Sequence, residues 1–279
     1  MGPQAACRNR ARSLLSRSRM MRTTRPLLLT LIAILLPAAL FAQGVEYRKY
    51  LLPINPGTVQ GADGARWMVE LTLANASFEP LSLFCFTGTC APIEDRTVHR
   101  FVTPPTDSIR PGLMYVPVDQ SHRVFAALRS RNTTPDSSER DFVSEIPVVH
   151  ENDFRTEVIE MTAVPIEANY RHMLRIYDAN ANEGADVRVR IFGMLNGQIV
   201  TGELVDTILT LHTPRGSASP YALPDEPSWG SLSAFSDLPE VRNYEEVHIR
   251  VESQSSNMAL WAFATATNNT TQRFAIYTP

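Results

Sequence analysis

Two cysteines, Cys85 and Cys90, are the residues of this chain whose chemistry is most tightly restricted by their spacing. They are separated by four residues in FCFTGTCAP, whereas a thioredoxin-like redox centre has two residues between its cysteines at a helix N-terminus. A structural zinc site needs four ligands, and the sequence holds no second cysteine pair. If Thr87 and Gly88 form a hairpin turn, the cysteines face each other at about 4.5 Å between Cα atoms, within disulfide range. We therefore predict a disulfide that pins a loop tip.

A tight grouping of histidine with acids occurs at His150, Glu151 and Asp153. The six histidines include no H-E-x-x-H or H-x-H spacing, so a solvated linker explains this group better than a metal or acid/base site. The sequence also contains no G-x-S-x-G motif and no glycine-rich phosphate loop. No catalytic residue is therefore assigned. Carboxylates far apart in sequence can still meet as a glycosidase pair, which keeps a hydrolase as the alternative.

Oxygen-bearing side chains alternate in YDANANEGAD, at Asp178, Asn180 and Asn182, as they do at the start of an EF-hand loop. The glycine comes one place late, at Gly184, and Val189 stands where the loop needs a bidentate acid. A strand-like segment follows at once. We expect a polar hairpin loop, with calcium as the alternative; no other cofactor is expected.

Three aromatic residues, Tyr221, Trp229 and Phe235, fall in a proline-rich stretch that is expected to connect strands. Aromatic side chains on a rigid loop can stack on sugars or anchor a protein partner. Such residues more often fold back over the end of a sandwich and seal it. These three are the candidate ligand-binding residues.

Period-two alternation of apolar and polar residues dominates the chain and indicates half-buried strands. It is clearest in RWMVELTLAN, ADVRVRIF and EVHIRVES. Asn196-Gly197 predicts a type I′ hairpin turn, because both central residues of that turn need positive φ. Proline and glycine recur at about the 8–12-residue spacing of an antiparallel sandwich. The pattern predicts an all-β fold of two tandem antiparallel β-sandwich domains, immunoglobulin-like or jelly-roll-like.

Residues 1–42 have the layout of a cleaved secretory signal peptide, with an arginine-rich stretch, an apolar run and small residues ending at Ala42. The apolar run of about 15 residues is shorter than the roughly 20 that a membrane-spanning helix needs. We place the first sandwich domain at 43–150 and the second at 151–279, with the boundary in VVHENDFRTE. A single larger double sheet is the rival organisation.

The expected leader contains seven of the 26 basic residues and none of the 29 acidic ones, which leaves 19 against 29 and a net charge of −10. An acidic surface disfavours nucleic acid and anionic membranes as partners. Export to an oxidising compartment also agrees with the predicted disulfide. We expect a secreted, periplasmic or cell-surface protein without a membrane span in its mature chain, and an extracellular protein or glycan as partner.

Three stretches resemble exported bacterial proteins built of tandem β-sandwich modules: SEIPVVHENDF, YRHMLRIYDANANEGADVRVRIFGMLNGQIV and LWAFATATNNTTQRFAIYTP. In those proteins a strand of the LRIYD kind opens the second module, and an NNTTQ turn precedes the last strand. The resemblance implies two modules and an exported bacterial setting. It implies no activity and no catalytic residue.

The expected function is therefore non-enzymatic: adhesion, surface structure or ligand binding. The alternative is an extracellular hydrolase with its site in the cleft between the domains, and a third class is an edge-strand assembly subunit. Acids, or a histidine and an acid, that converge in that cleft with shifted pKa values would favour the enzyme. A smooth apolar cleft with an exposed Trp229 would favour binding, and a long unpaired edge strand would favour assembly.

Overall fold

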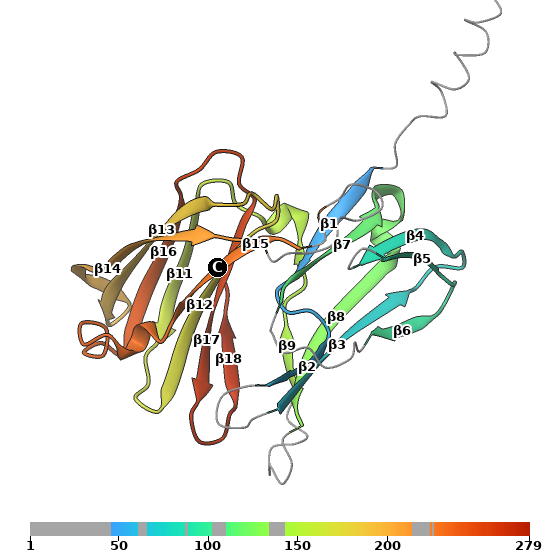
Figure 1. Ribbon diagram of the computed structural model, residues 1–279. Helices are drawn as coiled ribbons and strands as arrows, with labels where there is room; N and C mark the ends of the chain where they lie inside the picture. Colours follow the sequence, from blue (N-terminus) through green and yellow to red (C-terminus); the bar gives the residue numbers. More distant parts are fainter. Residues whose placement is uncertain are drawn as a thin grey trace, which may run out of the picture. The chain divides into compact units, whose positions relative to one another are not determined.

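The fold is all-β, and every strand pairing in the described part of the chain is antiparallel (Figure 1). The computed structural model describes residues 46–60, 66–86, 89–101, 110–133, 143–213, 224 and 226–279. The helices within these ranges are short 3-10 turns, and none is long and apolar enough to cross a membrane. The predicted fold class is confirmed to this extent: an all-β chain with several antiparallel sheets.

Two sheets come from the strands up to His150. Sheet I has the order β10-β1-β7-β4-β5, and sheet II has the order β2-β3-β8-β9, with β6 also paired to β3. The strands of sheet I are β1 (Tyr47–Leu52), β4 (Leu81–Phe86), β5 (Thr89–Ile93), β7 (Gly112–Pro117) and β10 (Val149–His150). Those of sheet II are β2 (Gly57–Gln60), β3 (Arg66–Asn75), β6 (Val98–Phe101), β8 (Val124–Asn132) and β9 (Val143–Ile146).

Two further sheets come from the strands after residue 157. Sheet III has the order β11-β16-β13-β14, and sheet IV has the order β15-β12-β17-β18. The strands of sheet III are β11 (Val158–Pro165), β13 (Ala185–Leu195), β14 (Gln198–Leu211) and β16 (Glu246–Ser253). Those of sheet IV are β12 (Tyr170–Asp178), β15 (Ser228–Ser233), β17 (Leu260–Asn268) and β18 (Phe274–Tyr277). The described strands therefore change from one pair of sheets to the other between His150 and Val158.

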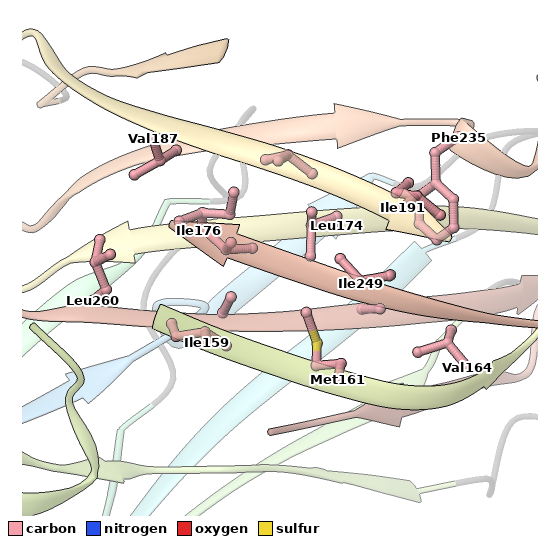
Figure 2. Close-up of a cluster of buried hydrophobic side chains, with 14 of the residues drawn as sticks. Ile159, Met161, Val164, Leu174, Ile176, Val187, Ile191, Phe235, Ile249 and Leu260 are labelled. Carbon is pink, nitrogen blue, oxygen red and sulfur yellow. The ribbon is translucent and has the colours of Figure 1, made fainter. Parts of the chain in front are cut away.

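Each pair of sheets encloses a cluster of buried apolar side chains. Leu52, Leu71 and Leu128 represent the cluster between sheets I and II. The larger cluster between sheets III and IV is shown in Figure 2 and includes Leu174 and Ile249. Burying each such side chain contributes about 1.5–3 kcal/mol relative to leaving it exposed, so these clusters account for much of the drive to fold.

A third buried cluster joins sheet I to sheet IV. Leu51, Leu113 and Tyr115 on sheet I pack with residues such as Tyr177 and Phe263 on sheet IV. Sheet IV is therefore buried on both faces, and residues 46–279 form one compact unit.

Strand β13 shows how the sequence pattern produces the sheet. Val187, Val189 and Ile191 are fully buried, as their alternation predicts. The intervening Arg188 and Arg190 lie on the outer face and form ion pairs with Asp206, Glu203 and Glu252. Opposite charges thus cover the polar face of the strand.

The hairpin between β13 and β14 turns at Asn196 and Gly197, as predicted. Their φ angles are +52° and +75°, the positive values that a type I′ turn needs. Leu195 pairs with Gln198 directly across this two-residue loop.

Candidate binding site

The two faces of strand β12 have different environments, and this difference creates the candidate site. His172, Leu174 and Ile176 point toward the core shared with sheet III. The alternate residues Arg171, Met173 and Arg175 line a cavity on the other face of sheet IV. Because successive side chains of a strand point to opposite faces, one strand serves both the core and the cavity.

The cavity has a volume of about 390 Å³ and lies between sheets II and IV. We call it the groove. This volume is within the range of small-molecule sites in proteins. The residues that line it are Ile54, Gln60, Trp67, Val69, Ser130, Arg171, Met173, Arg175, Phe263, Thr265, Thr267, Phe274 and Ile276.

Apolar and aromatic side chains form most of the groove wall. Trp67 of β3 meets Phe274 of β18 edge-on, with ring centroids 5.3 Å apart and an interplanar angle of 74°. Phe263, which is 1% exposed, and Val69, which is 2% exposed, complete a dry inner surface. No aspartate, glutamate or histidine is among the described lining residues. The only formal charges on this lining are those of the two arginines.

Arg175 is a buried cation in the lining of the groove. It is 8% exposed, its Nε lies 3.3 Å from Sδ of Met173, and its guanidinium carbon lies 5.9 Å from the centroid of the Trp229 ring. The hydroxyl of Tyr177 is a further neutral neighbour. Within the described chain, no carboxylate oxygen lies within 4.0 Å of the guanidinium nitrogens. A buried charge of this kind is unfavourable unless an anion accompanies it.

Arg171 lies four residues earlier on the same strand, about 13 Å away at Cα by strand geometry. Its Nη2 donates a hydrogen bond of 2.7 Å to Oε1 of Gln272, and its Nη1 donates one of 3.3 Å to Oδ1 of Asn269. These amides belong to the turn that follows β17. The guanidinium of Arg171 is therefore held by side-chain amides, whereas that of Arg175 contacts a thioether and an indole ring.

Tyr177 anchors the C-terminal end of β12. Its hydroxyl donates a hydrogen bond of 3.0 Å to the carbonyl oxygen of Pro53, and its ring stacks on Phe263 with centroids 6.0 Å apart. Burial raises the pKa of Tyr177 to about 12, against the lowering effect of the nearby Arg175. The phenol therefore stays neutral at physiological pH and provides no negative charge for Arg175.

The aromatic candidates from the sequence lie in different places. Trp229 is on strand β15, half-buried against the cluster between sheets I and IV. Phe235 is 1% exposed and packs beside His172 within the cluster of Figure 2, where no ligand can reach it. Tyr221 lies outside the described residues. The structure therefore does not bring Trp229 and Phe235 together on one surface.

Asp178, Asn180 and Asn182 form a hydrogen-bonded turn. Oδ1 of Asp178 accepts hydrogen bonds from the backbone N–H groups of Asn180 and Ala259, at 3.1 and 2.8 Å. Its Oδ2 accepts from the backbone and the side-chain amide of Asn182, at 3.1 and 2.7 Å. Oδ1 of Asn180 accepts from Nζ of Lys49 at 3.1 Å. Both carboxylate oxygens of Asp178 and Oδ1 of Asn180 are thus engaged with donors. The described residues contain no group of three or more His, Cys, Asp or Glu side chains that could hold a metal ion.

The expectation of a hairpin loop at this segment was wrong. β12 pairs with β15 and β17, and β13 pairs with β14 and β16, so the loop crosses from sheet IV to sheet III. The polar side chains of the loop satisfy backbone groups at this crossing. Local sequence could not distinguish the two cases, since both need a polar turn between strands.

Glu151 and Asp153 belong to a single 3-10 turn, Glu151–Asp153, between β10 and β11, and His150 is its N-cap residue. The N–H of His150 donates to Oδ2 of Asp153 at 3.3 Å, and the His150 ring meets Tyr50 edge-on at 4.8 Å. None of the three lines the groove.

The cysteine hairpin has the predicted register. Cys85 is opposite Cys90, and Phe86 is opposite Thr89, between β4 and β5. Thr87 and Gly88 lie outside the described residues, as do the cysteine side chains. The disulfide stays a prediction.

Sequence reasoning missed the residues that form the groove. One signal was present: Arg175 interrupts an otherwise apolar run in LRIY. Trp67 belongs to the apolar positions of the alternating segment RWMVELTLAN, but its partner Phe274 comes from the far end of the chain.

Comparison with known proteins adds no relative to this picture: no protein-family model, curated protein or solved structure gives a significant match to the chain.

Proposed function

We propose that this protein is an exported, non-enzymatic binding protein of two β-sandwich domains that takes a ligand in the groove between sheets II and IV. The observation that carries the proposal is the groove lining. It combines aromatic and aliphatic walls with a few hydroxyl and guanidinium groups, and its described residues include no carboxylate and no imidazole. This is the composition of small-molecule binding sites, in which a few polar groups orient a largely apolar ligand.

The hydrolase alternative lacks its chemistry in the groove. General acid–base catalysis needs a carboxyl or imidazole group within hydrogen-bond reach of the substrate. A histidine–acid pair does exist at His212 and Glu183, 2.9 Å apart, but it is exposed and does not line the groove. Hydrogen bonds from Thr213 and His212 lower the pKa of Glu183 to about 2, which makes this carboxylate a weak base at neutral pH.

The assembly alternative is favoured by one feature, the length of β14. This strand of 14 residues pairs with β13 and forms one edge of sheet III as described. Ile199, Val200 and Ile208 on it are exposed. Such an edge can accept another strand, and assembly that grows with protein concentration and is lost in Ile208→Lys would support this second role.

Export and the two-domain organisation are supported by separate observations. The strands up to His150 and those after residue 157 build different pairs of sheets around different cores. The leader has the layout of a signal peptide, and the register of Cys85 and Cys90 agrees with a disulfide, which belongs to an oxidising compartment.

The groove is tested with the neutral apolar fluorophore N-phenyl-1-naphthylamine and the mature protein. We expect saturable fluorescence enhancement that falls at least tenfold in affinity in Thr265→Trp, because the new ring occupies the groove. Ile208→Trp, which adds the same ring to the exposed face of sheet III, should leave the affinity unchanged. Absence of saturable binding in the wild type would contradict the proposal. Turnover of polysaccharide or peptide substrates would establish the hydrolase instead.

A further inference from the structure

We propose that the ligand of the groove is an amphipathic carboxylate, with its head group on Arg175 and its apolar body along Met173, Phe263, Trp67 and Phe274. This inference rests on the proposed function, because it assigns a ligand class to the same groove. It concerns small molecules such as fatty acids and other organic acids with an apolar body.

The described neighbours of Arg175 leave its positive charge without a compensating anion. Its neighbours are a thioether, an indole ring and a phenol, none of which carries a negative charge. Two arginines of strand β13 show the usual compensation: Arg188 pairs with Asp206, and Arg190 with Glu203 and Glu252. A buried guanidinium without a carboxylate is unfavourable unless an anion completes it. Arg175 also lines the groove, so that anion can arrive with a ligand.

The geometry of the guanidinium selects the type of anion. Its planar fork matches the two oxygens of a carboxylate in a bidentate pair. A doubly charged phosphate would leave excess negative charge in a dry site with one buried cation. Arg171 cannot supply the second charge at the same point, because it lies about 13 Å along the strand and is bound to Gln272 and Asn269.

The apolar lining between the two arginines favours a ligand whose body, beyond its carboxylate, is apolar. Met173 lies between them on the strand, and Phe263 faces Arg175 across the pairing of β12 with β17. Trp67 of sheet II and Phe274 of sheet IV form an aromatic edge pair that joins the two sides of the groove. An alkyl or aromatic body can bury its surface here without breaking a hydrogen bond, which a sugar could not do along most of this wall.

The experiment compares dodecanoate with dodecanol as competitors of N-phenyl-1-naphthylamine, each below its solubility limit. From competition with the fluorophore, the dissociation constant of dodecanoate for the wild type should be at least tenfold lower than that of dodecanol. In Arg175→Gln the dissociation constants of dodecanoate and dodecanol should differ by less than twofold, and the variant should still bind the fluorophore. Arg129→Gln, the loss of an exposed arginine that does not line the groove, should keep the preference. Dodecyl phosphate tests the head group and should bind more weakly than dodecanoate.

The outcomes separate the two proposals. If the fluorophore binds but acid and alcohol compete equally, the carboxylate inference fails and the binding function stands. If the fluorophore does not bind to the wild type, the binding function itself fails.

A measurement on the wild type covers the case in which Arg175→Gln does not fold. The carboxyl carbon of ¹³C-labelled dodecanoate should titrate at a lower pH when bound than when free, because a nearby guanidinium favours the ionised form. A bound acid that titrates at the same or a higher pH would overturn the inference.

Discussion

Nζ of Lys49 donates a hydrogen bond of 2.8 Å to the backbone carbonyl oxygen of Ala179, and this contact ties β1 of sheet I to the turn that ends β12. The same ammonium group reaches Oδ1 of Asn180 and lies beside the buried Asp178. Lys49 is the only lysine of the chain. Its positive charge therefore occupies the surroundings of the three side chains that suggested a calcium loop.

Removal of this ammonium group should destabilise the protein. We expect Lys49→Met to lower the free energy of unfolding by about 1–2 kcal/mol, because two hydrogen bonds from a charged donor are lost. Lys49→Arg should lose less, since it keeps the charge. Urea denaturation measures the effect. The matched control is Arg129→Met, which removes an exposed cation paired with Glu145 and should cost no more than about 0.5 kcal/mol. Equal losses of unfolding free energy in the two Met variants would show that the Lys49 contacts stabilise the protein no more than an exposed ion pair does.

His172 should make stability depend on pH. The residue is 1% exposed, and burial lowers its pKa against the raising effect of backbone groups at Pro165 and Tyr170. In the unfolded chain its pKa is about 6.5. Below that pH the unfolded state binds a proton that the folded state excludes, so stability falls as the pH decreases from about 7 toward 5. Above pH 7.5 both states are neutral and the contribution vanishes.

The test of His172 is a series of urea denaturation curves between pH 5 and 8. His172→Leu should flatten the fall of stability below pH 7, with little loss at pH 8. His122→Leu, a substitution at an exposed histidine, should leave the pH profile unchanged. A wild-type slope that survives in His172→Leu would place the titrating group elsewhere.

Two glycines of the same hairpin should respond differently to a methyl group. Gly197 has a φ of +75° with open space around its Cα, so Gly197→Ala should cost about 1 kcal/mol through backbone strain alone. Gly202, on β14, also has open space but no positive φ. Gly202→Ala should be neutral or stabilising by up to about 1 kcal/mol. Because neither position is crowded, thermal denaturation of both variants isolates the effect of backbone strain, and similar losses at the two positions would argue against it.

The cysteines should be oxidised in the exported protein. Thiol titration of mature protein under denaturing, non-reducing conditions should find no free thiol. Reduction should lower the free energy of unfolding by roughly 2 kcal/mol, because the loop between Cys85 and Cys90 is short. Two titratable thiols per chain would contradict the disulfide, although the strand register of the two residues would stand.

Local features of the fold were predictable from the sequence because they depend on neighbouring residues. The alternation Val187, Arg188, Val189 assigns its strand two faces, and the structure buries the valines while the arginine pairs with Asp206. Asn196 and Gly197 form the expected turn for a reason that lies within the residues themselves, their tolerance of positive φ.

Other features depended on partners that no local pattern names. YDANANEGAD reads the same whether it joins paired strands or crosses between sheets, and only the strand order shows the crossing. Phe235 was a surface candidate because its segment is rich in proline and polar residues, yet a core position beside His172 encloses it.

The sequence by itself determined the all-β class, the inward and outward faces of the clearest strands, the Asn196-Gly197 turn and the expectation of export. Periodicity and turn chemistry encode these properties within a few residues of one another. Only the tertiary structure decided that sheet IV is covered on both faces, that Trp67 meets Phe274, and that Arg175 is buried in the lining of an apolar groove. The physical reason is that burial and charge compensation are properties of assembled surfaces, and the residues that provide them come from distant parts of the chain.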